Sequence, residues 1–347
     1  MIVFTHKYLD KLSQHETTVF RFFIGMTFSL IIAFGFDWPL AMITPVFVAK
    51  FLGSTKPKMP FKALMGLFYI ILAAFILGGI FTRLLLPYPV VFLLVLTLVI
   101  FWLSYWGNSG GNEFVITMLL IGFTLVPMLA LLHQAVAEQA TIGFIFSCLL
   151  ALTISMLMHE IVPDKPEAHQ HKLDAVVNTP PLTKAVKVHY SLLTTIMITP
   201  VMTFFFYFNL TSTVLVLIFI ALMAQKPNLV AGVKGSKALL MGNTLGGLVA
   251  IAVYNLLVIM PTFTFLSLMF AVISIIFARL IFSGHKLAPL FAMALGTVII
   301  LISASTSGDA AASENFYIRI IQIGAACAYV VFTTILAGPW LKKISQL

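Results

Sequence analysis

Charged residues are scarce in this chain. Of 347 residues, 20 are Lys or Arg and 11 are Asp or Glu, so charged side chains make up 9% of the sequence, against about 25% in an ordinary soluble domain. Apolar residues make up 61%, and the mean hydropathy is +1.09. A folded chain of this composition has too little polar surface to stay dissolved in water, which excludes a soluble globular protein and indicates a lipid environment.

Cysteine is almost absent, and so are the common catalytic motifs. Cys148 and Cys327 both lie in apolar runs and form no C-x-x-C pair, so the sequence predicts neither a disulfide framework nor a zinc site. His169 and His171 stand in a polar stretch without a second pair of ligands. No G-x-x-x-x-G-K-[ST], H-E-x-x-H or G-x-S-x-G motif occurs, which excludes an ATP-driven pump within this chain. We expect no enzymatic activity, no metal and no cofactor.

Long apolar runs fill most of the remaining sequence and predict an all-α polytopic membrane protein. Most runs have 19 to 23 residues, enough for a helix to cross a hydrocarbon layer of about 30 Å. The first twenty residues are too polar for a signal peptide, so we expect no cleavage there. About 12 transmembrane helices are predicted, at 22–36, 38–49, 63–82, 84–106, 114–132, 140–158, 190–208, 212–224, 238–260, 262–282, 287–306 and 316–338.

The basic residues indicate the orientation of these spans. If the N-terminus starts in the cytoplasm and every run crosses once, 18 of the 20 basic residues fall on the inner side, and Arg83 and Arg319 fall outside. This agrees with the excess of Lys and Arg in cytoplasmic loops. We therefore expect both termini in the cytoplasm. The net charge of +9 reflects topology, and no nucleic-acid partner is predicted.

Two similar halves flank one polar linker. Lys62 to Gly66 opens the third run, and the similar segment Lys237 to Gly242 opens the ninth, about 175 residues later. Six spans in each half would give two parallel six-helix repeats of the same orientation, an arrangement common among transporters. The predicted organisation is a cytoplasmic tail 1–20, a first repeat 21–159, a cytoplasmic linker 160–187, a second repeat 188–340 and a cytoplasmic tail 341–347.

Three motifs carry a resemblance to a known group of proteins. They are Arg21 at the start of the first run, the segment from Trp38 to Val48, and the basic-then-glycine pattern from Lys237 to Gly247. The chain resembles the fusaric acid resistance and aromatic acid exporter superfamily, above all a smaller branch known mainly as an uncharacterised domain. The resemblance implies a bacterial inner-membrane efflux component for aromatic carboxylic acids, working with a periplasmic adaptor of the membrane-fusion type.

This chain departs from that superfamily in two respects. Relatives commonly carry a large cytoplasmic domain between the halves, whereas here the linker 160–187 is short. Lys62 and Lys237 stand where the pattern usually has Arg, which bears on any arginine-specific contact with an anion.

A carboxylate between two short predicted spans is the foremost site candidate. The runs 22–36 and 38–49 would reach only about 22 Å and 18 Å as helices, so we expect the turn at Asp37 and Trp38 within the membrane or in a cavity open to the outer face. The matching turn, at Asn209, precedes another short run, as in sites built from broken helices. Asp37 either binds a proton in a desolvated setting or is the N-cap of the short second helix.

An aromatic cluster beside a glycine-rich break is the second candidate. Tyr105 and Trp106 lead into a break that contains Asn108 and Glu113. Aromatic faces there either stack on a planar substrate, whose carboxylate meets the first N–H groups of the fifth helix, or form an interfacial belt followed by an ordinary turn.

Three further residues complete the candidate path for substrate or protons. Asn243 lies in the G-x-x-x-G stretch from Gly242 to Gly246, which either accompanies close helix packing or lines a polar path. Arg21 and Arg279 stand near span ends, where they either face the path or extend to the lipid headgroups.

Together these features predict an efflux permease for aromatic or other lipophilic weak acids, driven by the membrane potential or a proton gradient. With the interior negative, the potential favours outward movement of one anionic charge by about 2.3 kcal/mol per 100 mV. The alternative is a non-transporting membrane scaffold or assembly protein. The expected partners are a small weak-acid substrate, the lipid bilayer, a periplasmic adaptor and a second copy of the chain in a homo-oligomer.

Overall fold

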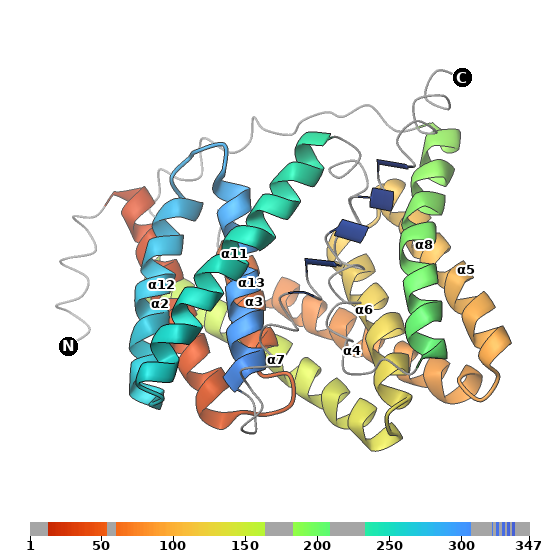
Figure 1. The fold of residues 1–347 in the computed structure, drawn as a ribbon, viewed down its shortest axis with the longest axis horizontal. Coiled ribbons are helices and arrows are strands. Elements are labelled where there is room, and N and C mark those ends of the chain that lie inside the picture. Colours follow the sequence, from red (N-terminus) through yellow and green to blue (C-terminus); the bar gives the residue numbers. More distant parts are fainter. Residues whose placement is uncertain are drawn as a thin grey trace. The chain divides into compact units, whose positions relative to one another are not determined.

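The computed structural model describes residues 13–53, 60–163, 183–208 and 233–306, with isolated positions between 321 and 336. All regular structure in these ranges is helical (Figure 1). The helices are α2 Gln14–Phe36, α3 Ile43–Leu52, α4 Phe61–Leu85, α5 Pro89–Asn108, α6 Glu113–Ala130, α7 Gln134–Ile161, α8 Lys184–Tyr207, α11 Val233–Ile259, α12 Phe263–Ile281 and α13 Ala288–Thr306.

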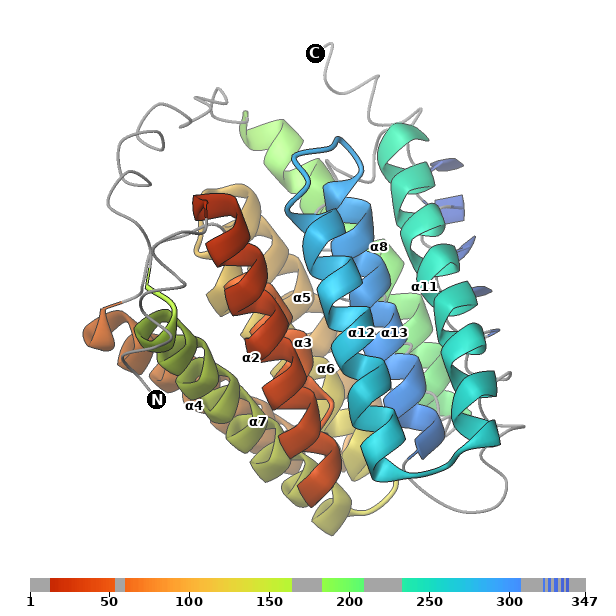
Figure 2. The same ribbon diagram turned by 90° about the vertical axis from the view of Figure 1, so that its left-hand side faces the viewer.

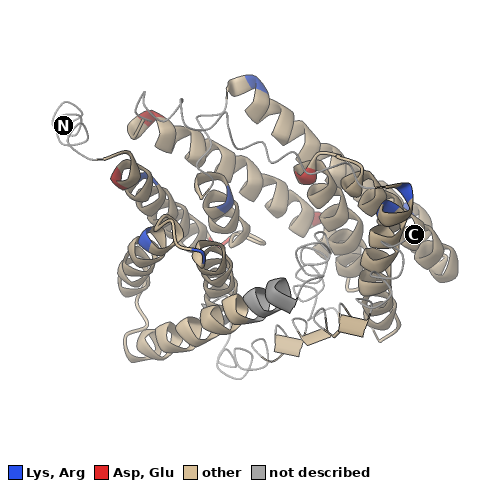
Figure 3. Ribbon diagram, turned by 90° about the horizontal axis from the view of Figure 1, so that it is seen from above, with Lys and Arg blue, Asp and Glu red and all other residues tan. Residues whose placement is uncertain are grey.

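Eight of the helices in these ranges are long and apolar enough to cross a membrane. Charged side chains are sparse along the described helices and stand mostly near their ends (Figure 3). Large apolar side chains are exposed on the outside, including Leu94 with 67% and Val258 with 59% of its surface accessible. Such a surface suits contact with lipid tails. The chain is a multi-pass, all-helical membrane protein, and the predicted spans 212–224 and 316–338 lie wholly or mostly outside the described residues.

The first helix is longer than the sequence predicted. α2 has 23 residues rather than 15, so it reaches about 34 Å and can cross the hydrocarbon layer. Ser13 begins it with a capping box, in which the Ser13 side chain accepts from the Glu16 N–H and the Glu16 carboxylate accepts from the Ser13 N–H. Hydropathy missed the start of α2 because Thr17 and Thr18 are polar but buried. Their hydroxyls donate to the carbonyls of Ser13 and Gln14.

The second helix is short, as predicted. α3 has 10 residues and reaches about 15 Å. It begins at Ile43 rather than at 38, because residues 39–42 form a turn. The short second helix expected in the other half, at 212–224, lies outside the described residues.

The described helices form two compact units. The first contains α2, α3, α7 from Phe146 onward, α11 from Gly242 onward, α12 and α13. Here α2 packs against α12 and α3, and α12 packs against α13 (Figure 2). Aromatic contacts join α2 to α12 along its length, since the rings of Phe34 and Phe270 lie 5.2 Å apart and those of Phe22 and Phe282 lie 5.6 Å apart.

The second unit contains α4 from Leu67 onward, α5, α6, α7 up to Ile145, and α8. In this unit α5 packs against both α8 and α6 (Figure 1). The ring of Phe92 on α5 stacks on Phe206 of α8 at 5.3 Å, and it lies 5.4 Å from Phe81 of α4. Each unit therefore combines helices from both halves of the sequence.

Glycines bring pairs of helices into backbone contact. A Cβ atom added at Gly78 of α4 would lie 2.5 Å from the carbonyl oxygen of Gly122 on α6. In the other unit, a Cβ atom at Gly246 of α11 would lie 2.6 Å from the carbonyl oxygen of Ala294 on α13. Small residues allow this close approach in membranes, so the packing interpretation of the G-x-x-x-G stretch is confirmed.

Two adjacent glycines on α4 give a test of this contact. Gly78→Ala should lower the free energy of unfolding by roughly 1–3 kcal/mol, because the methyl group pushes α4 away from the α6 backbone. Gly79→Ala is the matched control, since its Cβ would meet no atom within 4 Å, and we expect unchanged or slightly increased stability. Thermal unfolding of the purified protein in detergent measures both. Equal losses in the two variants would contradict the assigned contact.

Candidate functional site

Asp37 ends the first helix instead of starting the second. Its backbone has φ 41° and ψ 52°, the left-handed conformation of a C-cap, and its N–H donates to the Ala33 carbonyl at 3.1 Å. The residue that precedes α3 is Met42, which makes no side-chain capping bond. The predicted N-cap role of Asp37 is wrong, because the turn 39–42 separates it from the first N–H groups of α3.

The turn that follows Asp37 is held against α7 by hydrogen bonds to one residue, Ser147. Trp38 Nε1 donates to Ser147 Oγ at 2.8 Å, and Ser147 Oγ donates to the Leu40 carbonyl at 3.2 Å. Thr44 Oγ1, in the first turn of α3, donates to the Ser147 carbonyl at 3.3 Å. Leu40 has φ 61°, a conformation that costs an ordinary residue about 1–2 kcal/mol and persists only where neighbours hold it.

Trp38 belongs to this fastening. Besides its bond to Ser147, its ring meets Phe146 edge-on, with centroids 5.1 Å apart and planes at 86°. Both the indole N–H and the aromatic ring of Trp38 thus have partners on α7. The side chain positions the turn, and we do not assign it to a ligand.

Asp37 itself is exposed and lines a pocket of about 440 Å³. The pocket lies between the ends of α2 and α11 and the start of α12, all in the first unit. Its walls are mostly apolar, and Asp37 is the one charged residue among the nine that line it. The aromatic lining residues are Phe34, Tyr254 and Phe263, and the aliphatic ones include Leu257, Val258 and Leu266.

Sequence reasoning missed the partners of Asp37 in this pocket. Residues 37 and 261 both follow spans that run outward in the predicted topology, so both turns fall on the same side of the membrane. Their shared side of the membrane was the only sign in the sequence that the two turns could meet. It does not identify neighbours, because several turns share that side and only packing decides which of them meet.

Arg21 is buried rather than extended toward the headgroups. Only 2% of its surface is accessible, and its Nη1 donates to the Val162 carbonyl, just beyond the end of α7, at 3.2 Å. A cation at a helix C-terminus is favoured by the helix dipole and by the unpaired terminal carbonyls. The snorkelling alternative is wrong for this residue, because its side chain is buried and bonded to the Val162 carbonyl, and α2 begins seven residues before it.

The aromatic cluster lies on the outside of α5. Trp106 is exposed, and Tyr105 is half-buried with its ring stacked on Phe101 at 6.4 Å. At the start of α6, the Asn112 side chain accepts from the N–H groups of Phe114 and Val115, at 2.9 and 3.4 Å. These amides are already paired, which favours the interfacial belt and ordinary turn over a carboxylate site.

Two asparagines among the candidates join helices. Asn108 Nδ2 donates to the Ser104 carbonyl at 2.9 Å and to Ser191 Oγ of α8 at 3.3 Å. Asn243 is buried, and its Oδ1 accepts from Thr297 Oγ1 of α13 at 2.7 Å. Interhelical hydrogen bonds of this kind hold membrane helices together.

The remaining candidates are not brought together with Asp37. Glu113 is exposed in the first turn of α6, and Arg279 is exposed in the last turn of α12. Asn209 lies outside the described residues. Among the residues that the structure describes, no group of three or more His, Cys, Asp or Glu side chains is placed to hold a metal ion.

Comparison with known proteins gives one match. Residues 18–158 match the model of a family described as a protein of unknown function, DUF2955. This segment covers nearly the same residues as the first predicted repeat. No curated protein and no solved structure matches the chain. The resemblance to the aromatic acid exporters stays a prediction.

Two serines on α7 test the fastening of the turn. Ser147→Ala leaves both the Trp38 N–H and the Leu40 carbonyl without their partner, so we expect the free energy of unfolding to fall by roughly 1–3 kcal/mol. Ser155→Ala is the control, because Ser155 is buried on the same helix and its Oγ has no hydrogen-bond partner in the described part of the chain. The measurement is unfolding in detergent followed by tryptophan fluorescence. A loss in Ser155→Ala as large as that in Ser147→Ala would refute the special role of Ser147.

Proposed function

We propose that the protein is a bacterial inner-membrane efflux permease that exports aromatic or other lipophilic weak acids. The observation that carries the proposal is the pocket at Asp37, whose volume of about 440 Å³ falls within the range of small-molecule sites, about 300–1,000 Å³. Three aromatic rings supply a surface for a planar apolar body. The alternative of a scaffold gives no role to a carboxylate held at such a pocket.

The charge of Asp37 suits release of an acid. When protonated, its carboxyl group can donate a hydrogen bond to the carboxylate of the substrate. When ionised, it repels an anion in the same pocket. Proton transfer at Asp37 therefore switches the pocket between holding and releasing the acid. The membrane potential adds to this, because it favours outward movement of an anion by about 2.3 kcal/mol per 100 mV.

We also propose twelve transmembrane helices in two parallel repeats, with both termini in the cytoplasm. Advancing by six predicted spans takes α2 to α8, α5 to α12 and α6 to α13. Two packing pairs are consistent with this operation, because α2 against α12 corresponds to α8 against α5, and α12 against α13 corresponds to α5 against α6. Each of these pairs lies within one compact unit.

A pair of adjacent glycines occurs on the corresponding span of each half, although the two pairs lie 168 residues apart and so differ by about two helical turns from the repeat spacing of about 175. The pairs are Gly78-Gly79 on α4, the third span, and Gly246-Gly247 on α11, the ninth. In each pair the first glycine meets the backbone of a partner helix, whereas a Cβ on the second would meet no atom within 4 Å. The partner helices, α6 and α13, also differ by six spans. The same two spans of each half, the third and the fifth, are therefore in backbone contact, which is consistent with the proposed duplication.

The partners proposed for the permease follow from its placement. Export across the inner membrane delivers the acid to the periplasm, where an adaptor of the membrane-fusion type would carry it onward. A homo-oligomer is proposed as the working form. Both are tested by purification from membranes with a tag on the chain and identification of what remains bound in mild detergent.

Asp37→Asn tests the site in cells. Asparagine cannot ionise, so the repulsion that releases the acid is lost, and we expect retention of the acid to rise to that of cells lacking the protein. Glu160→Gln is the control, because it removes the same charge from an exposed position near the C-terminal end of α7. The measurement is growth and intracellular accumulation with a panel of aromatic and aliphatic weak acids, at equal protein levels in the membrane.

Two outcomes count against the proposal. If deletion and overproduction leave susceptibility and retention unchanged for every acid, the export function fails. If the protein exports an acid but Asp37→Asn exports it at the rate of the unaltered protein, the export function stands and Asp37 is removed from its mechanism.

A further inference from the structure

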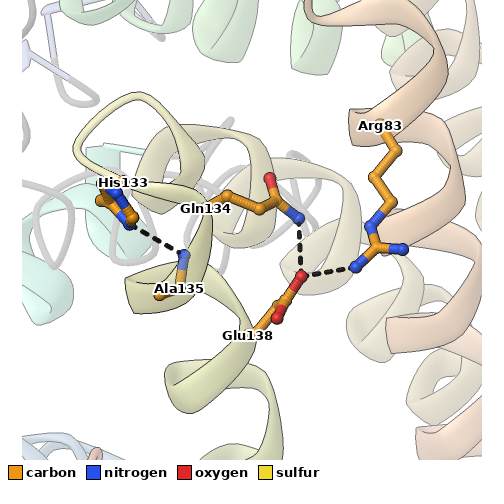
Figure 4. A network of polar contacts seen from close by, with 5 residues as sticks. All are labelled: Arg83, His133, Gln134, Ala135 and Glu138. Atoms are coloured by element: carbon orange, nitrogen blue, oxygen red, sulfur yellow. Dashed lines mark hydrogen bonds and ion pairs between the residues drawn. The ribbon is translucent and has the colours of Figure 1, made fainter.

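A second pocket, in the other compact unit, is lined by an ion pair. It has a volume of about 350 Å³ and lies between the end of α4, the C-terminal part of α6 and the start of α7. Arg83 Nη2 donates to Glu138 Oε1, and Gln134 Nε2 donates to the same oxygen at 3.1 Å (Figure 4). All three side chains line the pocket. None of them entered the site expected from the sequence.

The rest of the lining is almost entirely apolar. A guanidinium at the edge of an apolar pocket presents the two features that an amphiphilic anion requires, which are a surface for its apolar body and donors for its charged end. The apolar side chains that line the pocket are those of Phe75, Ile76, Ile80, Val126, Ala137 and Ile142.

The ion pair at this edge is weakly held. The side chains of Arg83 and Glu138 are 66% and 48% exposed, and exposed ion pairs add little to stability. A role in tying α4 to α7 therefore accounts poorly for an arginine on the side of the chain where the predicted topology leaves only two basic residues. A guanidinium has five N–H donors in a planar fork, so Arg83 can turn from Glu138 to a second carboxylate.

We propose that this pocket binds small amphiphilic carboxylates, with the apolar body between α4, α6 and α7 and the carboxylate on Arg83. Without ligand, Glu138 accepts a hydrogen bond from the Arg83 guanidinium, and the carboxylate of the ligand replaces Glu138 there. A carboxylate is favoured over an amine because the Arg83 guanidinium has further N–H groups to donate, whereas Glu138 Oε1 already accepts from both Arg83 and Gln134. The site is separate from the Asp37 pocket and does not depend on export.

Opposite effects of two substitutions distinguish this site from a structural ion pair. The experiment uses the purified full-length protein in detergent and measures equilibrium binding of 1-naphthoate by fluorescence, with neutral 1-naphthamide as the reference probe. Arg83→Gln should weaken naphthoate binding about ten- to a hundredfold, the size expected for loss of a hydrogen bond to a charged group. Glu138→Gln should tighten it, because the competing carboxylate is gone. Binding of the neutral amide should change little in both.

A third substitution fills the pocket without disturbing the charges. Gly79 lines the pocket, and a Cβ atom there would meet nothing within 4 Å, so Gly79→Leu should abolish binding of both probes while the helix is preserved. Gly66→Leu is the matched control, because Gly66 lies on the same helix, its Cβ would also meet nothing within 4 Å, and it does not line the pocket. We expect unchanged binding in Gly66→Leu.

The proposal is overturned if Arg83→Gln and Glu138→Gln shift naphthoate binding in the same direction or leave it unchanged, or if Gly79→Leu binds like Gly66→Leu. It is also overturned if added phosphatidylglycerol, an anionic lipid, displaces naphthoate from the unaltered protein at a lower concentration than free carboxylates do, which would assign the pocket to lipid. If Arg83→Gln does not fold, the two glycine variants decide. Binding without any export in cells would leave this site in place and remove only the function proposed above.

Discussion

The hydroxyl group of Ser147 holds the turn on which the arrangement of the first unit depends. It accepts from the indole of Trp38 and donates to the carbonyl of Leu40, so it fixes both sides of a turn that contains a leucine with φ 61°. The turn connects the 23-residue helix α2 to the 10-residue helix α3, which packs beside it. Because Trp38 is drawn to α7, the preceding residue, Asp37, is left exposed at the pocket formed with α11 and α12.

Elsewhere the helices are joined by a few polar contacts and by direct backbone approach. In lipid the hydrophobic effect does not favour one apolar helix surface over another, so close packing and interhelical hydrogen bonds decide which helices meet. Here Gly122 and Gly246 permit backbone contact, and Asn108 and Asn243 supply side-chain bonds to neighbouring helices. Four of the candidates for a substrate path, Arg21, Trp38, Asn108 and Asn243, thus make hydrogen bonds between separate elements of the fold. Of the candidates that the structure describes, Asp37 lines the pocket between α2, α11 and α12.

Hydropathy predicted the helices well where the residues of a helix are apolar along its whole length. The spans from α4 to α7, and the short α3, follow directly from apolar runs between Gly, Pro and charged breaks. It failed at the start of α2, where Thr17, Thr18 and Arg21 are polar yet buried against protein. The pocket at Asp37 was only half predicted, because Tyr254 and Phe263 are distant in sequence, and an apolar residue in a membrane helix carries no sign of whether it faces lipid or a cavity. The Arg83 and Glu138 pair was missed for a different reason, because two charges at span ends are equally consistent with headgroup contact.

The mixture of both halves within each compact unit bears on how such a chain is made. α2 ends at Phe36 and is synthesised well before α12, against which it packs, because α12 begins only at Phe263. α2 can therefore pack against α12 only after most of the polypeptide has been synthesised. In the duplication proposed above, a six-helix ancestor would make this contact with the equivalent helix of a second copy. Fusion of two copies into one chain would turn that encounter into an intramolecular one, at the much higher effective concentration that a covalent linker provides.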